Sequence, residues 1–335
     1  MRTSISRTLR TALLFTVVLV LCTAGKRPAL TIFMIGDSTM ANKSIANGNL
    51  ERGWGMVLQG FFTDRVLVDN HAVNGRSSKS FIDEGRWDKV LEKMKKGDYV
   101  FIQFGHNDEK PQPDRHTDVG STFDANLERF VKETRERGGI PVLFNCVVRR
   151  NFQSEAKLGD DDEKLRNSVY EGETNVGDVL IDTHGEYAKA PRRVAERLHV
   201  PFVDANAITH NLEQSLGAEK SKDLHLWLLP GQVPSHPKGR QDNTHYSVYG
   251  AHVVAGLLVD EIARQVPALK KYVRHYDYIV SDEGRGNFMT LQEAVDAVPE
   301  GQKAVVRVLH GDWQKPVVPN GKRVKLSVSS YATVR

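Results

Sequence analysis

Cysteine is scarce in this sequence. Only Cys22 and Cys146 occur among the 335 residues, and Cys22 closes an apolar amino-terminal segment of the kind that is removed during export. The mature chain would then hold one cysteine and could form no internal disulfide. Cys146 lies within an apolar run, where a free thiol usually packs as a small hydrophobic group. We therefore expect a core thiol there rather than a catalytic one.

The sequence also lacks a block of basic residues. Lys and Arg number 46 against 42 Asp and Glu, and three of the arginines (Arg2, Arg7 and Arg10) lie in the first ten residues. Without those three the balance is 43 (46 minus 3) to 42, so the mature chain is close to neutral. This pattern lacks the electrostatic footprint of a nucleic-acid-binding protein, and we expect no nucleic-acid partner.

Spacings typical of metal or cofactor sites are missing as well. The 12 histidines show no zinc-ligand spacing, and Gly284-Arg285-Gly286 lacks the third glycine of a dinucleotide-binding loop. The apolar run 12–21 is only ten residues long, too short to span a bilayer comfortably. We expect no metal, no cofactor and no association with a membrane.

Residues 1–24 have the anatomy of a secretory signal peptide. Arginines precede the apolar run, and the small residues Cys22-Thr-Ala24 follow it. Cleavage after Ala24 would make the protein secreted or periplasmic. Lipid attachment at Cys22 is the alternative, which the bulky Leu21 before it disfavours.

Short apolar runs alternate with helical patterns between residues 25 and 274. This alternation predicts an α/β fold, a three-layer α/β/α sandwich around a mostly parallel five-stranded sheet. The strand-like runs are 30–35, 66–70, 99–104, 141–147 and 201–203, and the helical segments are 124–137, 183–198 and 247–266. We expect residues 219–243, rich in Pro, Gly and Lys, to form a long loop before the last helix.

Three chemically useful residues follow predicted strands. Ser38 comes directly after the first strand and before an expected helix, Gly75 follows the second strand, and Asn107 follows the third. In parallel sheets the loops at the carboxyl ends of strands carry the functional residues. Singly, each has a structural alternative, since Ser38 and Asn107 can cap helices and Gly75 can make a tight turn.

Asp242 and His245 stand three positions apart, just before the last helical segment. On one turn of chain the carboxylate can reach the imidazole Nδ1–H, which leaves Nε2 free to take a proton from a hydroxyl group. The alternative is a capping turn at the start of the helix. With Ser38, the pair supplies a nucleophile, a base and an orienting acid.

Taken together, these blocks resemble the SGNH (GDSL-type) hydrolases, in which Ser, Gly, Asn and His motifs occur in this order. Over residues 30–272 the chain is most similar to the rhamnogalacturonan acetylesterases. The motifs that carry this resemblance are Arg52-Gly-Trp-Gly, Asn74-Gly-Arg-Ser-Ser-Lys-Ser-Phe, Glu84-Gly-Arg-Trp, Gln103-Phe-Gly-His-Asn-Asp and Asp242-Asn-Thr-His-Tyr.

The resemblance implies an esterase that removes acetyl groups from pectin, with the rhamnogalacturonan backbone as its substrate. Ser38 would be the nucleophile, His245 the base and Asp242 its orienting acid. Ser38, Gly75 and Asn107 would form the oxyanion hole. A same-fold esterase acting on acetylated xylan or on lipids stays open, as does a non-catalytic pectin-binding protein. The oligomeric state is left open too.

The composition shifts near Arg274, which divides the chain into an SGNH esterase domain, 25–274, and a segment, 275–335. Residues 279–299 resemble the opening of a pectin methylesterase, a family in which this stretch begins a right-handed parallel β-helix. The resemblance implies an incomplete β-helix start without that family's catalytic residues. A segment of this length buries little core of its own, so we expect low independent stability.

Overall fold

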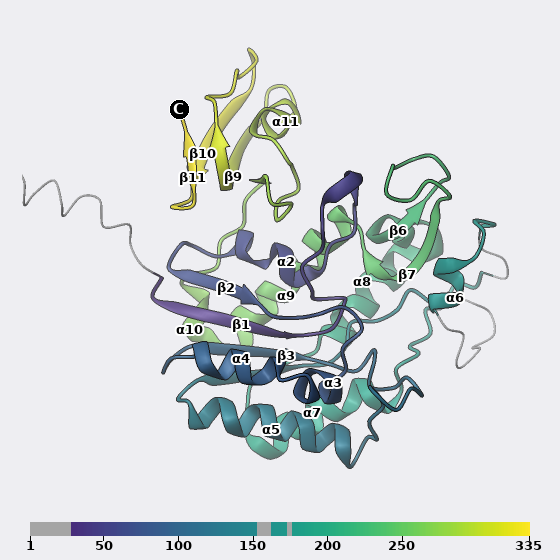
Figure 1. Cartoon of the computed structure of the whole chain (residues 1–335). Helices are drawn as coiled ribbons and strands as arrows, with labels where there is room; N and C mark the ends of the chain where they lie inside the picture. The colour runs from purple at the N-terminus through teal and green to yellow at the C-terminus, as the bar shows by residue number, and fades with distance from the viewer. Residues whose placement is uncertain (1–27, 153–161, 173–175) are drawn as a thin grey trace, which may run out of the picture.

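The computed structural model describes residues 28–152, 162–172 and 176–335. The predicted signal peptide, 1–24, lies outside the described residues. Figure 1 shows a central sheet between layers of helices, and a smaller sheet (yellow) beside it.

The central sheet has five parallel strands in the order β2-β1-β3-β4-β5. This is the parallel α/β arrangement that the sequence predicts, and each strand overlaps its predicted run. Both faces of the sheet are covered, which explains why the strands read as continuous apolar runs. The strands are β1 (Leu30–Gly36), β2 (Val66–Asn70), β3 (Tyr99–Gln103), β4 (Ile140–Phe144) and β5 (Phe202–Val203).

Side chains on alternate positions of the strands enter two separate cores. On β1, Ile32 and Met34 join the core beneath α9, whereas Phe33 and Ile35 join the core beneath α5 and α7. Period-two alternation of this kind is what a strand buried on both faces requires. The first layer contains α2 (Trp54–Val57), α8 (Ala205–Lys220), α9 (Val248–Gln265) and α10 (Pro267–Lys270), and the second contains α3 (Ser78–Asp83), α4 (Arg86–Lys93), α5 (Thr122–Glu136) and α7 (Glu186–Leu198).

The prediction that residues 219–243 form a loop is wrong in part. After α8 and a short 3-10 turn (Ser221–Leu224), β6 (His225–Leu228) pairs antiparallel with β7 (Arg240–Tyr246). Strand β7 shows no apolar alternation because long-range polar contacts satisfy its side chains. Asn243, for example, accepts hydrogen bonds at Oδ1 from Arg150 Nη1 and Trp227 Nε1, both at 3.0 Å.

Residues beyond Arg274 form a separate sheet of four parallel strands, with a core cluster of their own around Val306 and Val308. This sheet also packs on the larger domain, since Ile279 and Leu309 belong to the main core and Arg52 Nε donates to Gly284 O (2.8 Å). Its elements are β8 (Tyr278–Ser281), α11 (Leu291–Asp296), β9 (Lys303–Trp313), β10 (Arg323–Val328) and β11 (Ala332–Val334).

Candidate active site

The carboxyl ends of the first three strands meet at one edge of the sheet, and Ser38, Gly75 and Asn107 all lie in loops at that edge. Val73 N, in the loop after β2, donates to Gly36 O at the end of β1 (3.0 Å). Asn107 Nδ2 donates to Arg76 O in the same loop (3.2 Å). The hairpin β6–β7 then brings His245 to this edge, so residues from four parts of the chain form one site.

Ser38 lies in a tight turn, and the helix expected directly after it is absent there. Met40 N and Ala41 N both donate to Asp37 O (3.3 and 3.0 Å), and the next α-helix begins only at Trp54. Asp37 closes the turn with its side chain, because its Oδ1 accepts from Thr39 N and Thr39 Oγ1 (2.9 and 2.8 Å). The turn projects Ser38 away from the sheet and toward β7.

The Arg52-Gly-Trp-Gly motif packs beneath this turn. A Cβ on Gly53 would lie 2.3 Å from Ala41 O, and one on Gly55 would lie 2.6 Å from Met40 O. Trp54 is fully buried and donates through Nε1 to Gln103 (2.9 Å). The two glycines are therefore needed for close backbone approach, and Trp54 is a packing residue.

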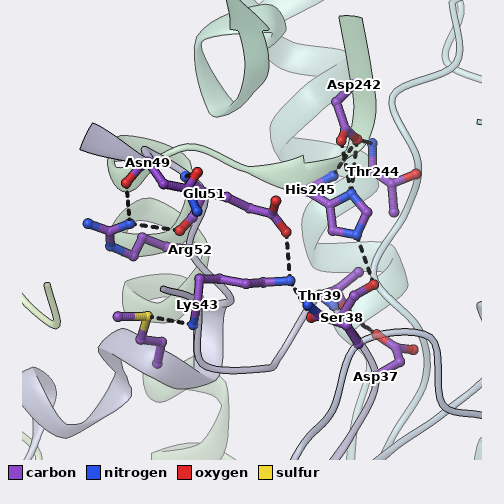
Figure 2. Close-up of polar contacts among 12 residues, drawn as sticks. Asp37, Ser38, Thr39, Lys43, Asn49, Glu51, Arg52, Asp242, Thr244 and His245 are labelled. Atoms are coloured by element: carbon purple, nitrogen blue, oxygen red, sulfur yellow. Dashed lines mark hydrogen bonds and ion pairs between the residues drawn. The ribbon is translucent and has the colours of Figure 1, made fainter. Parts of the chain in front are cut away.

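The side chains of Ser38, His245 and Asp242 form a continuous hydrogen-bonded line (Figure 2). His245 Nε2 lies 2.8 Å from Ser38 Oγ, and Nδ1 lies 3.0 and 3.1 Å from the two oxygens of Asp242. A carboxylate only accepts, so we assign the proton to Nδ1 and leave Nε2 as the acceptor for the Ser38 hydroxyl. This is the geometry needed to remove a proton from serine.

A bulge in β7 produces the Asp242–His245 contact. The β6–β7 register moves from Leu226 opposite Asp242 to His225 opposite Tyr246, so the intervening residues of β7 lie outside the ladder. Within the bulge, Asp242 Oδ1 accepts hydrogen bonds from Thr244 N and His245 N (3.0 and 2.9 Å). The local turn expected from the three-residue spacing thus exists, but it interrupts a strand instead of opening the helix.

Arg240 is a second partner of Asp242 that sequence reasoning missed. Its Nη2 and Nε donate to Asp242 Oδ2 (2.9 and 3.1 Å). Burial by itself would raise the pKa of the Asp242 carboxyl, but His245 first and Arg240 after it hold that pKa well below its ordinary value. Positions two apart share one face of a strand, so the pair was detectable only once β7 was known to be a strand.

Possible amide donors lie on Ser38 and in the neighbouring loops. Gly75 has a φ of +75°, and a Cβ built there would meet nothing within 4 Å. Within the described residues, the N–H groups of Ser38 and Gly75 form no hydrogen bond to a backbone carbonyl. Arg115 Nη1 donates to Asn107 Oδ1 (3.3 Å) and fixes the carboxamide with its NH2 group toward the Gly75 loop. This arrangement can bind a developing oxyanion.

Asp108 joins the loops that carry Gly75 and Asn107. The carboxyl group is fully buried and accepts from Ser78 N and Oγ, from Gly105 N (3.1 Å) and from Thr117 Oγ1 (2.9 Å). Burial raises the pKa of Asp108 to about 7, against the hydrogen bonds from Ser78 and Thr117. The side chain therefore holds together the loops that carry Gly75 and Asn107.

We predict that Asp108→Ala lowers the free energy of unfolding by about 2–4 kcal/mol, because two buried backbone N–H groups lose their acceptor. Urea denaturation of the purified protein measures this loss. Asp114→Ala, at an exposed position in the neighbouring loop, is the matched control and should stay within about 0.5 kcal/mol of the wild type. If Asp108→Ala lowers the free energy of unfolding by less than about 0.5 kcal/mol, Asp108 does not hold these loops together.

A buried ionic cluster lies behind the Asn107 loop. His184 Nδ1 contacts Glu109 Oε2 (2.9 Å) and Nε2 contacts Val147 O (3.1 Å). Both partners only accept, so both ring nitrogens donate and His184 is an imidazolium. Burial alone would lower the pKa of His184, but Cys146 and Glu109 outweigh it and raise the pKa well above its ordinary value. Cys146 is free and buried, as expected.

Glu109 also pairs with Arg149 Nη2 (2.6 Å), so the cluster anchors the loop on both sides. Its members are far apart in sequence, so no spacing of residues could have predicted it.

Among the described residues, no group of His, Cys, Asp or Glu side chains could hold a metal ion. In the same part of the chain, no helix has the length and apolar character needed to cross a bilayer.

Comparisons with known proteins identify the family of the chain. A model of the GDSL-like Lipase/Acylhydrolase family matches residues 34–227, more than half of the chain. Rhamnogalacturonan acetylesterase RhgT of Bacillus subtilis is 36% identical over 260 residues, which are 78% of this chain and 98% of that protein. A rhamnogalacturonan acetylesterase of Emericella nidulans is 25% identical over 255 residues, 75% of this chain and 91% of that protein.

A solved structure, protein YXIM of Bacillus subtilis, shares the fold with a TM-score of 0.54 at 24% identity. The match covers 73% of this chain and 58% of that one. The extent of the family match and the identity to RhgT are sufficient to place the chain. It belongs to the GDSL-like lipase/acylhydrolase family and is an ester hydrolase.

Proposed function

We propose that the chain is a carbohydrate acetylesterase that removes acetyl groups from pectin, with the rhamnogalacturonan backbone as its substrate. The observation that carries the proposal is the hydrogen-bonded line from Asp242 through His245 to Ser38, with 2.8 Å between His245 Nε2 and Ser38 Oγ. The names of the two acetylesterase relatives support the choice of substrate. We expect Ser38, His245 and Asp242 to act as nucleophile, base and orienting acid.

In the first half of the reaction His245 Nε2 removes the Ser38 proton while Oγ attacks the acetyl carbonyl carbon. The negative charge that develops on the carbonyl oxygen is stabilised by the N–H groups of Ser38 and Gly75 and by the Asn107 carboxamide. The attack forms a tetrahedral intermediate. Its collapse breaks the bond between the acetyl carbon and the sugar oxygen, which takes the proton from His245 and leaves as a hydroxyl group. Ser38 is then acetylated.

In the second half His245 removes a proton from water, which attacks the acetyl-serine carbonyl at the same oxyanion site. Collapse of the second tetrahedral intermediate breaks the bond to Ser38 Oγ, which takes the proton from His245, and acetic acid leaves and ionises to acetate in solvent. In both halves Asp242 stabilises the imidazolium and keeps its Nδ1–H in place. No metal or organic cofactor is needed for these steps.

Acetate release from three substrates tests the proposal. We expect rapid release from acetylated rhamnogalacturonan, slower release from acetylated xylan, and little hydrolysis of a long-chain ester, with Ser38→Ala as the blank. Faster release from xylan or from the long-chain ester would refute the pectin assignment. Pectin binding without acetate release at any pH would favour a non-catalytic binding protein.

We predict that Asn107→Ala lowers kcat by about 10²–10³-fold, the usual effect of losing one oxyanion donor. Steady-state kinetics with a chromogenic acetate ester measures it. Asn211→Ala, exposed on α8, is the matched control and should leave kcat unchanged. A loss below tenfold would show that Asn107 is not an oxyanion donor.

We also propose that residues 25–274 are the esterase domain and that residues 275–335 are the start of a parallel β-helix. In support, Val306 of β9 pairs in parallel with Tyr278 before it and with Leu326 after it, so three successive passes of the chain stack on one another.

The proposed signal peptide would deliver the enzyme to the periplasm or the medium. Amino-terminal sequencing of the exported protein should then give Gly25 as its first residue.

A further inference from the structure

A chain of charged side chains runs from Asp242 to the loop after β2. Arg240 pairs with Asp242, and its Nη2 lies 3.9 Å from Glu51 Oε2. The other oxygen of Glu51 lies 2.6 Å from Lys43 Nζ, which also donates to Asn74 Oδ1 (2.6 Å). Figure 2 shows the Lys43–Glu51 pair beside Ser38 and His245. None of these side chains other than Asp242 has a role in the reaction steps above.

The backbone explains why Glu51 is so near the base. Arg52 forms a bridge with Tyr246, and Arg52 N donates to Tyr246 O (3.0 Å). This antiparallel bridge holds the segment that carries Glu51 beside the end of β7 that carries His245. The Arg52 side chain donates in turn to Gly284 O, so the turn after β8 holds this segment in place.

Burial makes this ion pair costly to maintain. The Lys43 side chain is only 3% exposed and the Glu51 side chain 14%. Burial lowers the pKa of the Lys43 ammonium, which Glu51 partly opposes. Burial would raise the pKa of Glu51, yet His245 and Lys43 hold it below its ordinary value. Apolar side chains often replace such a pair without loss of stability, so stability alone is a weak reason for its presence.

The charges of the pair act in opposite senses on His245. A carboxylate near an imidazole favours its protonated form, and an ammonium disfavours it. Other titratable groups also face His245. They are Asp242 and Arg240 on β7, Asp37 after β1, the buried His106 after β3, and Arg166 of α6 (Asp162–Asn167), whose Nη1 is 3.4 Å from Nδ1. Because the single variants below leave those groups in place, the effect of the pair can be separated from theirs.

We propose that Lys43 and Glu51 are positioning residues for the hydrolysis, Glu51 supporting protonated His245 and Lys43 opposing it, so that the pair sets the pH range in which His245 is an active base. This inference rests on the proposed function, in which His245 is the general base.

The pH dependence of kcat/KM for acetate release tests the inference, since its acid limb reports the free enzyme's essential base. Glu51→Gln should move the acid limb to lower pH, and Lys43→Met should move it to higher pH, each by about 0.5–1.5 units for a partly buried charge. The double variant Lys43→Met/Glu51→Gln restores the charge balance and should return the limb to within about 0.3 units of the wild type.

Glu186→Gln and Lys189→Met, which break an exposed ion pair on α7 (2.9 Å), are the matched controls and should not move the limb. The rate at which a fluorophosphonate modifies Ser38, followed across pH, is a second readout that needs no polymer substrate. If Lys43→Met does not fold, the shift of the acid limb in Glu51→Gln tests the inference by itself.

Opposite movements in either readout support the inference, even if no pectin releases acetate and the proposed substrate fails. Unmoved limbs, or movement in the same direction for both single variants, would overturn it and leave the pair a structural role only. A wild type that reacts in neither assay would overturn both the inference and the proposed function.

Discussion

Replacing Ser38 with alanine should lower acetate release by about 10⁴–10⁶-fold, the range seen when a serine nucleophile acting with a histidine is removed. No acetyl-enzyme can then form, and only stabilisation by the oxyanion donors remains. Initial rates with a chromogenic acetate ester and with acetylated rhamnogalacturonan measure the loss. Both substrates should be affected alike, because the lost step is common to them.

The Ser38 variant should keep its fold. Its hydroxyl contacts His245 Nε2, so the free energy of unfolding should change by only about 1 kcal/mol. Ser215→Ala, exposed on α8, is the matched control and should retain full activity. Activity of Ser38→Ala within about a hundredfold of the wild type would mean that another group is the nucleophile.

Asp242→Asn should lower kcat by about 10⁴-fold, because an amide NH2 group facing His245 favours the wrong tautomer. His245 Nε2 would then carry the proton and could not accept one from Ser38. Steady-state kinetics with the chromogenic ester measures the effect, with Asp114→Asn at an exposed position as the matched control. A loss below about a hundredfold would show that Asp242 does not set the tautomer.

The same substitution has a stability signature with a defined sign. Because the pKa of Asp242 is depressed in the folded chain, its ionised form stabilises the fold above the pKa of an unfolded aspartate. That contribution is lost as the pH falls through the folded value. The stability difference between wild type and Asp242→Asn should therefore be largest near neutral pH and shrink below about pH 4. Urea denaturation at several pH values follows it.

Much of the fold was predictable because its signals are local. Each strand of the central sheet is a short apolar run, and burial on both faces leaves that run without polar interruptions. Helices α5, α7 and α9 were similarly visible from apolar residues on one face and from glycines or capping residues at their ends. The prediction of a helix after Ser38 failed because Asp37 closes the turn with its own carboxylate, and no periodic segment follows until Trp54.

Local patterns of residues along the chain determined the five parallel strands and the placement of Ser38, Gly75 and Asn107 at their carboxyl ends. Only the tertiary structure decided that β6 and β7 pair, that a bulge turns Asp242 toward His245, and that Arg240, Glu51 and Lys43 surround this pair. The physical reason is that apolar burial repeats with the period of a strand or helix, whereas a polar side chain needs one partner with suitable geometry. That partner can lie anywhere in the sequence, as Glu51 and Arg240 show, because they contact each other although they are far apart in the chain. No periodic pattern in the sequence identifies such a partner.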